Sequence, residues 1–262
     1  MDIRLDGRCA LITGGSEGLG KAMALRFADS GADVAILARR QDVLDAAATE
    51  VDAAGPGKVV ALSCDLMDAA ATEKAFTTAL EGLGQIDILV NNAGTSRAGP
   101  FEDISDQDWQ NDFNLKLFAA IRLCRLALPG MKSRKWGRII NVLNTGAKAP
   151  PPASAPTSVT RAAGLALTKV LSGEGAPHNV LVNALMVGLI KSGQWERAHA
   201  EKNPDQPLEE FLQDMADSRK LPIGRMGEAV EFANIACFLA SDAGGYITGT
   251  SINVDGGRSP VV

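Results

Sequence analysis

The sequence predicts an α/β fold in which a doubly wound parallel sheet lies between two layers of helices. Two observations support this expectation. Short apolar or β-branched runs alternate with helix-length segments along all 262 residues. In addition, the first apolar run leads directly into a glycine-rich segment, residues 13–20, which is typical of a strand that turns into a helix beside a phosphate group.

Seven runs have the length and composition of buried parallel strands. They are residues 9–12, 34–37, 59–62, 86–90, 138–143, 180–185 and 251–254. Helices are expected at residues 21–30, 42–54, 68–81, 107–131, 162–171 and 229–240. No linker, repeat or low-complexity run interrupts this alternation, and α/β folds of such length commonly form one domain. We therefore expect a single three-layer α/β/α domain of Rossmann type over residues 1–262.

The glycines after the first strand favour a dinucleotide site. A Cβ atom at Gly14, Gly18 or Gly20 would keep the backbone away from a pyrophosphate. The helix that follows presents free N–H groups and the positive end of its dipole. We expect the loop to bind a cofactor through these three glycines together with Ser16 and Leu19.

Composition excludes several classes of function. The net charge is −5, which argues against a nucleic-acid-binding surface. No apolar run reaches the roughly 20 residues that a membrane span needs, and the N-terminus lacks a signal-peptide pattern. The four cysteines are isolated from one another, and His178 and His199 are far apart, so neither disulfides nor a metal site is expected. These features predict a cytoplasmic protein that does not contact membranes.

Further motifs complete a resemblance to a known family. They are Asp65-Leu66, Asn91-Asn92-Ala93-Gly94, Asn114, and a C-terminal stretch that runs from Tyr246-Ile247-Thr248-Gly249 to Asp255-Gly256-Gly257. With residues 13–20, they make the chain resemble the short-chain dehydrogenase/reductase family over essentially its full length. Members are mostly NAD- or NADP-dependent oxidoreductases of alcohols and ketones and are commonly tetrameric. The resemblance therefore implies a small-molecule substrate and a homotetramer or homodimer.

The same resemblance implies more cofactor contacts at the ends of later strands. In the family, an aspartate holds the adenine, the Asn-Asn-Ala-Gly segment steadies the sheet beside the cofactor, and a hydroxyl after the sixth strand contacts the cofactor. The matching residues here are Asp65, Leu66, Asn91, Ala93, Gly94, Gly188 and Ser192.

The end of the second strand indicates which cofactor is used. An NAD-preferring site places a carboxylate there to bind the ribose hydroxyls, but this chain has Ala38 followed by Arg39 and Arg40. A guanidinium suits a 2′-phosphate because it is a rigid fork of donors with a permanent charge. NADP(H) is therefore expected. NAD(H) remains the alternative if both arginines are solvated surface charges. Glu17 favours this alternative, because some NADP-binding relatives carry a basic residue at that position.

The expected reaction centre departs from the family pattern. Members carry an asparagine, a serine, a tyrosine thirteen residues after the serine, and a lysine four residues further on. The matching residues here are Asn114, Asn144, Thr157 and Arg161, and the one tyrosine, Tyr246, is far away in the sequence. A threonine is too weak an acid to replace tyrosine, and an arginine does not give up its proton. Asn144 and Arg161 still have hydrogen-bond donors that can bind and polarise an oxygen atom. Arg161 can also hold the cofactor ribose.

Three functions remain open for these residues. The favoured one is an NADP-dependent oxidoreductase of an alcohol or ketone, with a proton from water, the substrate, or a substitute acid such as Lys148 or His199. The second is a non-redox lyase, isomerase or hydrolase in which Asn114, Asn144 and Arg161 stabilise an enolate or oxyanion. The third is a catalytically silent nucleotide-binding subunit. In each case residues 189–222, with a helix at 208–216, are expected to form a lid over the substrate.

Overall fold

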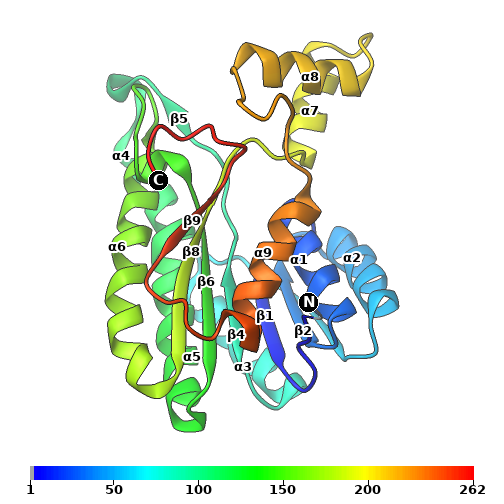
Figure 1. Ribbon diagram of the computed structural model, residues 1–262, viewed down its shortest axis with the longest axis vertical. Coiled ribbons are helices and arrows are strands. Elements are labelled where there is room, and N and C mark those ends of the chain that lie inside the picture. The colour runs from blue at the N-terminus through cyan, green and yellow to red at the C-terminus, as the bar shows by residue number, and fades with distance from the viewer. Residues whose placement is uncertain (1–2) are drawn as a thin grey trace.

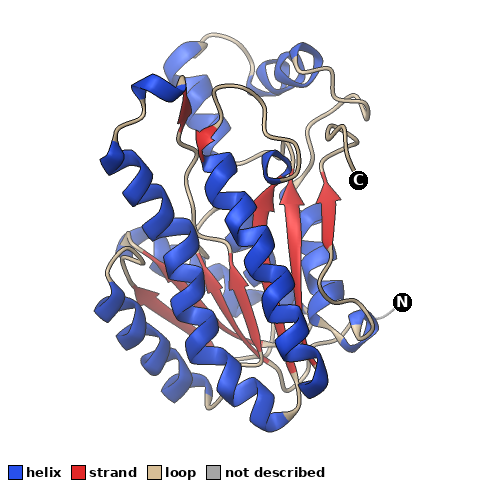
Figure 2. Ribbon diagram, turned by 90° about the vertical axis from the view of Figure 1, so that its left-hand side faces the viewer, coloured by secondary structure: helices blue, strands red, loops and turns tan. Residues whose placement is uncertain are grey.

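The computed structural model describes residues 3–262, apart from the side chains of residues 194 and 202. Its main sheet has seven parallel strands in the order β3-β2-β1-β4-β6-β8-β9. These strands are β1 (Cys9–Thr13), β2 (Asp33–Ala38), β3 (Val59–Ser63), β4 (Ile88–Asn91), β6 (Gly137–Asn144), β8 (Val180–Val187) and β9 (Ser251–Val254). All seven expected strands are present and helices cover both faces of the sheet (Figure 1, Figure 2), which confirms the doubly wound α/β class.

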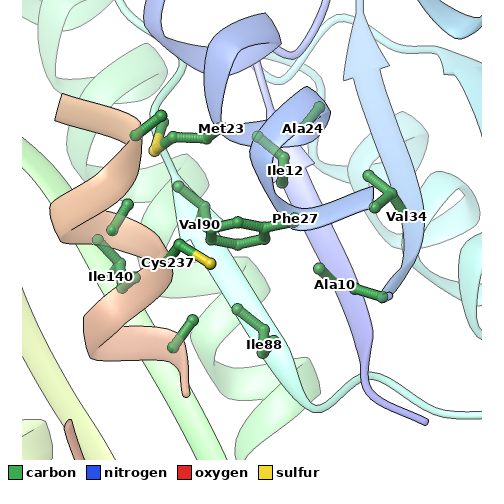
Figure 3. Close-up of a cluster of buried hydrophobic side chains, with 14 of the residues drawn as sticks. Ala10, Ile12, Met23, Ala24, Phe27, Val34, Ile88, Val90, Ile140 and Cys237 are labelled. Carbon is green, nitrogen blue, oxygen red and sulfur yellow. The ribbon is translucent and has the colours of Figure 1, made fainter. Parts of the chain in front are cut away.

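The helices divide between the two faces of the sheet. One face carries α1 (Gly18–Asp29), α2 (Gln41–Ala54) and α9 (Ala229–Ala240), and the other carries α3 (Ala69–Leu83), α5 (Ala119–Arg134) and α6 (Thr157–Gly175). Each strand contributes side chains to the apolar cores on both faces of the sheet, because successive side chains point to opposite faces. Ile12 thus belongs to one core and Leu11 to the other. The fully buried Phe27 lies among Ile12, Val90 and Cys237 in the first core (Figure 3).

Two helices differ from their expected bounds in ways that affect the site. The segment expected as one helix at 107–131 is divided into α4 (Asp106–Phe113), a π-helical segment η2 (Asn114–Phe118) and α5. Such π-helical turns are frequent at functional sites. Helix α6 begins at Thr157 instead of residue 162, so its first turns carry the predicted catalytic residues Thr157 and Arg161. The apolar pattern missed this start because residues 157–161 are mostly polar.

Shorter elements surround the end of the sheet where the strands terminate. Strands β5 (Ala98–Gly99) and β7 (Ala155–Pro156) form a small antiparallel pair. Helices α7 (Gly193–Lys202) and α8 (Leu208–Ser218) project beyond the sheet (Figure 1), and Phe211 and Leu212 pack there in a separate apolar cluster. The remaining turns are η1 (Phe101–Asp103), η3 (Thr145–Ala147), η4 (Ala176–His178) and η5 (Asp242–Gly244). Within residues 3–262, none of the helices combines the length and apolar character needed to cross a membrane.

Candidate functional site

A cleft of about 1670 Å³ opens at the carboxyl ends of the strands. It lies where the strand order reverses between β1 and β4, which is the point at which doubly wound sheets bind ligands. The lining comes from the β1–α1 loop, the ends of several strands, the start of α6, the segment 187–198 and the C-terminal tail. Because pockets for one drug-sized ligand measure roughly 300–1,000 Å³, this cleft has room for a cofactor and a substrate together.

Backbone geometry shapes the glycine loop at one end of the cleft. Gly14 has a φ of 65°, in the left-handed region that glycine tolerates. A Cβ atom on Gly20 would lie only 2.0 Å from the carbonyl oxygen of Gly14, so the first turn of α1 approaches the loop closely because residue 20 is glycine. Asn92 fixes the loop, since its Nδ2 donates to the carbonyl oxygens of Thr13 at 2.9 Å and Gly14 at 3.2 Å.

This loop fits the pyrophosphate of a dinucleotide. The Glu17 side chain does not cap α1, so the first N–H groups of the helix remain available beside Ser16 and Leu19, which line the cleft. Gly18 faces Ser192 at the edge of the cleft, because a Cβ atom on Gly18 would lie 3.8 Å from the Cβ of Ser192. The cradle that the glycines leave open is the observation that favours a bound dinucleotide.

Exposed charges surround the end of β2. Arg39 and Arg40 both line the cleft and are exposed. Arg40 forms an ion pair with Glu17, and Nη1 of Arg197 in α7 lies 3.9 Å from Oε1 of the same carboxylate. Arg39 has no ion pair within residues 3–262. Of the two arginines predicted to read a 2′-phosphate, Arg39 is therefore the one whose guanidinium is free.

The other predicted cofactor residues separate into those that line the cleft and those behind it. Asp65 is exposed, and its Oδ1 accepts a hydrogen bond from the N–H of Met67 at 3.0 Å. Asn91 is buried between β4 and β6, where its Nδ2 donates to Oδ1 of Asn141 at 2.8 Å, so it stabilises the sheet. The members of this set that line the cleft are Leu66, Ala93, Gly94, Gly188 and Ser192.

Thr157 joins three elements at the floor of the cleft. Its hydroxyl donates to the carbonyl oxygen of Arg97 at 2.6 Å. It accepts from the N–H of Arg97 at 3.1 Å and from Nζ of Lys116 at 2.8 Å. A hydroxyl has one donor and two acceptor sites, so the hydrogen-bonding capacity of this side chain is filled within the protein.

Lys116 was not among the residues predicted for the site, yet it lies buried directly behind Thr157, which lines the cleft. Its side chain is 0% exposed and forms an ion pair with Asp112, which is 3% exposed. Desolvation lowers the pKa of Lys116 to about 8, against the opposing hydrogen bond to Asp112. A sequence signal did exist, because Asp112 and Lys116 form an i, i+4 charge pair that brackets Asn114.

Arg161 is the second cation of this region and is half-buried. Its Nη1 donates to the carbonyl oxygen of Val142 at 2.6 Å, while its Nε has no partner in the described chain. Gly94 makes room for it, because a Cβ atom there would lie 2.6 Å from Nη2 of Arg161. Burial lowers the pKa of Arg161 to about 10, so the guanidinium stays charged near neutral pH. Lys116 and Arg161 thus face one carboxylate, Asp112, and the floor carries a net positive charge.

Asn144 and Ser158 add neutral hydrogen-bonding groups to the floor. Asn144 ends β6, lines the cleft, and has a buried Oδ1 without a hydrogen-bond partner among residues 3–262. Ser158 is buried and lines the cleft next to it: a Cβ atom on Gly146 would lie 2.5 Å from Ser158 Oγ and 3.3 Å from Asn144 Oδ1. Ser158 was also not predicted, because the family resemblance drew attention to its neighbour. An amide and a hydroxyl are both suited to bind an oxygen atom.

The remaining candidates, Asn114, Lys148 and His199, are not among the residues that line the cleft. Asn114 is half-buried at the start of η2. The structure places Nζ of Lys148 against the edge strand β9, at 2.8 Å from Oδ1 of Asn253, and not free in the cleft. Nε2 of His199 lies 2.6 Å from the carbonyl oxygen of Gln206 within the lid segment.

Comparison with known proteins extends the likeness along the whole chain. Residues 8–203 match the family described as short chain dehydrogenase. The chain is 36% identical to oxidoreductase UcpA of Salmonella typhimurium, over 98% of this chain and 96% of that protein. L-sorbose reductase from Gluconobacter frateurii, solved with NADPH and L-sorbose, aligns with a TM-score of 0.94 at 33% identity over 100% of both chains. An NADPH-bound short chain oxidoreductase from Pseudomonas aeruginosa PAO1, described as containing an atypical catalytic center, aligns with a TM-score of 0.91 at 34% identity over 99% of both.

Proposed function

Because this chain belongs to the short-chain dehydrogenase family, we propose that it is an NADP(H)-dependent oxidoreductase that interconverts an alcohol and a ketone in the cleft. One observation carries the proposal: the buried Lys116 and the half-buried Arg161 lie near one another with a single carboxylate, Asp112, to balance two positive charges. Negative charge develops on the carbonyl oxygen when a ketone is reduced, and fixed positive charge in a desolvated site stabilises it.

The cofactor assignment is supported by the open glycine cradle and by the free guanidinium of Arg39. In this proposal the N–H groups at the start of α1 bind the pyrophosphate, Arg39 binds the 2′-phosphate and Arg161 binds the nicotinamide ribose. When bound, the nicotinamide supplies or accepts the hydride. The NADPH found in two similar structures, at 33% and 34% identity, agrees with this choice over NAD(H).

The substrate oxygen is held by three groups that line the cleft. Asn144 and Ser158 donate hydrogen bonds through their amide and hydroxyl, and Arg161 adds a charge-assisted donor. Asn144 and Ser158 take over the orienting role that a serine has in the family pattern, and Arg161 stands in the place of the lysine. Asn114 contributes through the π-helical segment that carries Lys116.

The proton comes from Lys116 through Thr157. The Thr157 hydroxyl turns from the carbonyl oxygen of Arg97 toward the cleft and gives its hydrogen to the substrate oxygen, while Nζ of Lys116, 2.8 Å away, replaces that hydrogen. The substrate gains a hydroxyl proton and Lys116 becomes a neutral amine. The weak acidity of threonine does not prevent this transfer, because the hydroxyl is protonated again as it gives its hydrogen away.

The proposal also includes the surroundings of the site. Residues 189–222 close over the substrate. Lys191 anchors the start of this segment, since its Nζ lies 3.0 Å from Glu209 and 2.9 Å from Glu228. The whole of residues 1–262 acts as one domain, in a cytoplasmic homotetramer or homodimer. Sedimentation of a 27.4 kDa species at micromolar concentration would contradict the oligomer.

Isotope transfer tests the function directly. Binding of NADPH, NADP, NADH and NAD is measured first by fluorescence and thermal shift. NADPH deuterated at C4 is then incubated with the protein and a panel of ketones and aldehydes, and alcohols are analysed by mass spectrometry. We expect selective NADPH binding and deuterium on the carbinol carbon. Conversion of a substrate without label transfer would favour the non-redox lyase, isomerase or hydrolase, and binding without any conversion would favour the silent subunit.

A further inference from the structure

The cleft is strongly cationic although the chain as a whole is acidic. The net charge of the protein is −5. Among the described residues that line the cleft, Glu17 is the one acidic side chain. The basic residues of the lining are all arginines: Arg39, Arg40, Arg161, Arg197, Arg219 and Arg258. A cleft with positive charge in a protein whose net charge is negative indicates a site for anions.

Apart from Arg161, which lies at the floor, these arginines form two groups. Arg40 and Arg197 both lie near Glu17 at the glycine-loop end, where Arg39 is also found. Arg219 directly follows α8, and Arg258 lies in the C-terminal tail after β9. Figure 1 shows that this tail, in red, lies at the end of the sheet from which α7 and α8 project. The phosphates of the proposed cofactor account for the first group only.

Backbone contacts bring Arg219 and Arg258 into one neighbourhood. The N–H of Ile223 donates to the carbonyl oxygen of Gly256 at 3.2 Å, which joins the segment after α8 to the C-terminal tail. A Cβ atom on Gly257 would lie 3.4 Å from Cβ of Pro222. The positive charge of Arg219 adds to burial in lowering the pKa of Arg258. The two arginines therefore lie in one neighbourhood of the cleft lining and interact electrostatically.

Neither arginine forms an ion pair with a carboxylate within residues 3–262, although the charge of Asp255 acts against the lowering of the Arg258 pKa. The nearby Asp255 is engaged by backbone, since its Oδ1 accepts from the N–H of Gly257 at 3.0 Å and its Oδ2 from the N–H of Ser259 at 2.7 Å. Arg219 instead lies over the ring of Trp195, with Cζ 5.4 Å from the centroid. By contrast, the nearby Arg225 is paired with Glu231 at 2.7 Å and is not part of the cleft lining.

We propose that Arg219 and Arg258 bind a carboxylate or phosphate group of the substrate, so that the protein acts on an anionic ketone or alcohol. This inference rests on the oxidoreductase function proposed above. Guanidinium groups match the planar or tetrahedral oxygens of such anions through paired N–H donors. Trp195, Pro150 and Pro151 line the same cleft and supply apolar contacts for the body of the substrate.

Matched probe pairs test the anion site without requiring turnover. The protein is saturated with NADP, and binding is measured by calorimetry for 4-oxopentanoate against its methyl ester, and for dihydroxyacetone phosphate against dihydroxyacetone. The anionic member of at least one pair is expected to bind about tenfold or more tightly than its neutral partner, as charge-assisted hydrogen bonds predict. The pair with the larger ratio identifies carboxylate or phosphate as the recognised group. Equal binding within both pairs overturns the proposal.

Variants assign the preference to the two arginines. Arg219→Gln combined with Arg258→Gln is expected to remove the difference between anionic and neutral probes and to leave NADPH affinity unchanged. Lys220→Gln is the matched control, since this exposed neighbour of Arg219 loses the same charge outside the lining. If the double variant loses NADPH affinity and keeps the probe preference, the arginines serve the cofactor and the proposal is wrong. Because binding is measured, a protein without hydride transfer can still pass this test.

Discussion

The two ends of the cleft use charge in opposite ways. At the glycine loop, Arg40 and Glu17 form an ion pair whose side chains are 57% and 44% exposed. At the floor, Lys116 and Asp112 form a pair whose side chains are 0% and 3% exposed. The first end is positioned by backbone geometry and its charges remain solvated, whereas the second end depends on a few desolvated groups. Substitutions should therefore have small effects at the first end and large effects at the second.

The largest effect is expected from Lys116→Met. This change leaves the carboxylate of Asp112 buried without its partner, and breaking such a pair costs about 3–5 kcal/mol. Urea unfolding should show this loss, and reductase activity should disappear. Arg40→Met is the control at the exposed end and should unfold almost like the parent. The double change Lys116→Met with Asp112→Asn should recover stability without activity, and an active double variant would exclude Lys116 as the proton source.

A substantial effect on cofactor choice is expected from Arg39→Ala. Loss of charge-assisted hydrogen bonds to a 2′-phosphate should weaken NADPH binding by roughly tenfold or more. NADH binding should change little, because NADH lacks that phosphate. Fluorescence titration with both cofactors measures the difference, and Arg125→Ala on the exposed surface of α5 is a matched control. An equal loss for both cofactors would show that Arg39 has a different role.

The pH dependence should follow the buried lysine. Because desolvation lowers the pKa of Lys116 to about 8, its ammonium is present below that pH and is lost above it. Ketone reduction, which consumes this proton, should therefore fall by about tenfold per pH unit above 8. Alcohol oxidation, which needs the neutral amine, should instead rise as the pH approaches 8 and level off above it. The ¹³Cε chemical shift of Lys116, identified by comparison with Lys116→Arg, reports the titration directly. A midpoint near 10.5 would contradict the relay.

The smallest effect is expected from Glu17→Gln. Removal of this carboxylate frees Arg40 and relieves repulsion of a phosphate, so NADPH should bind about two- to fivefold more tightly. Titration against NADH separates this effect from a general change in the loop. Weaker NADPH binding would instead show that Glu17 holds Arg40 in the orientation that the phosphate needs.

The same contrast explains what the sequence could predict. The glycine cradle depends on residues that are contiguous in the chain, namely Gly14, Gly18 and Gly20, and on the strand and helix that flank them. A local pattern therefore predicted both the sheet and the dinucleotide loop. The order of the seven strands in the sheet was not predicted, because the alternation of strands and helices does not say which strands are neighbours.

The floor of the cleft is assembled from separate segments, so its chemistry was only partly predictable. Thr157 and Arg161 were identified through their spacing in the family pattern. Lys116 was missed because a lysine in a predicted helix is usually solvated. Its burial depends on the π-helical segment η2 and on contact with Thr157, which is 41 residues away. Arg97 is likewise joined to Thr157 through backbone atoms that carry no signal in the sequence.

The exposed triad of Glu17, Arg40 and Arg197 makes the cofactor end sensitive to ionic strength. At about 0.15 M salt the Debye length is about 8 Å, so the attraction between such solvated arginines and a phosphate is already weakened before contact. The pair of Lys116 and Asp112 is shielded from those ions by protein. Added salt should therefore raise the cofactor concentration needed for half-saturation. The turnover rate at saturating cofactor should stay unchanged.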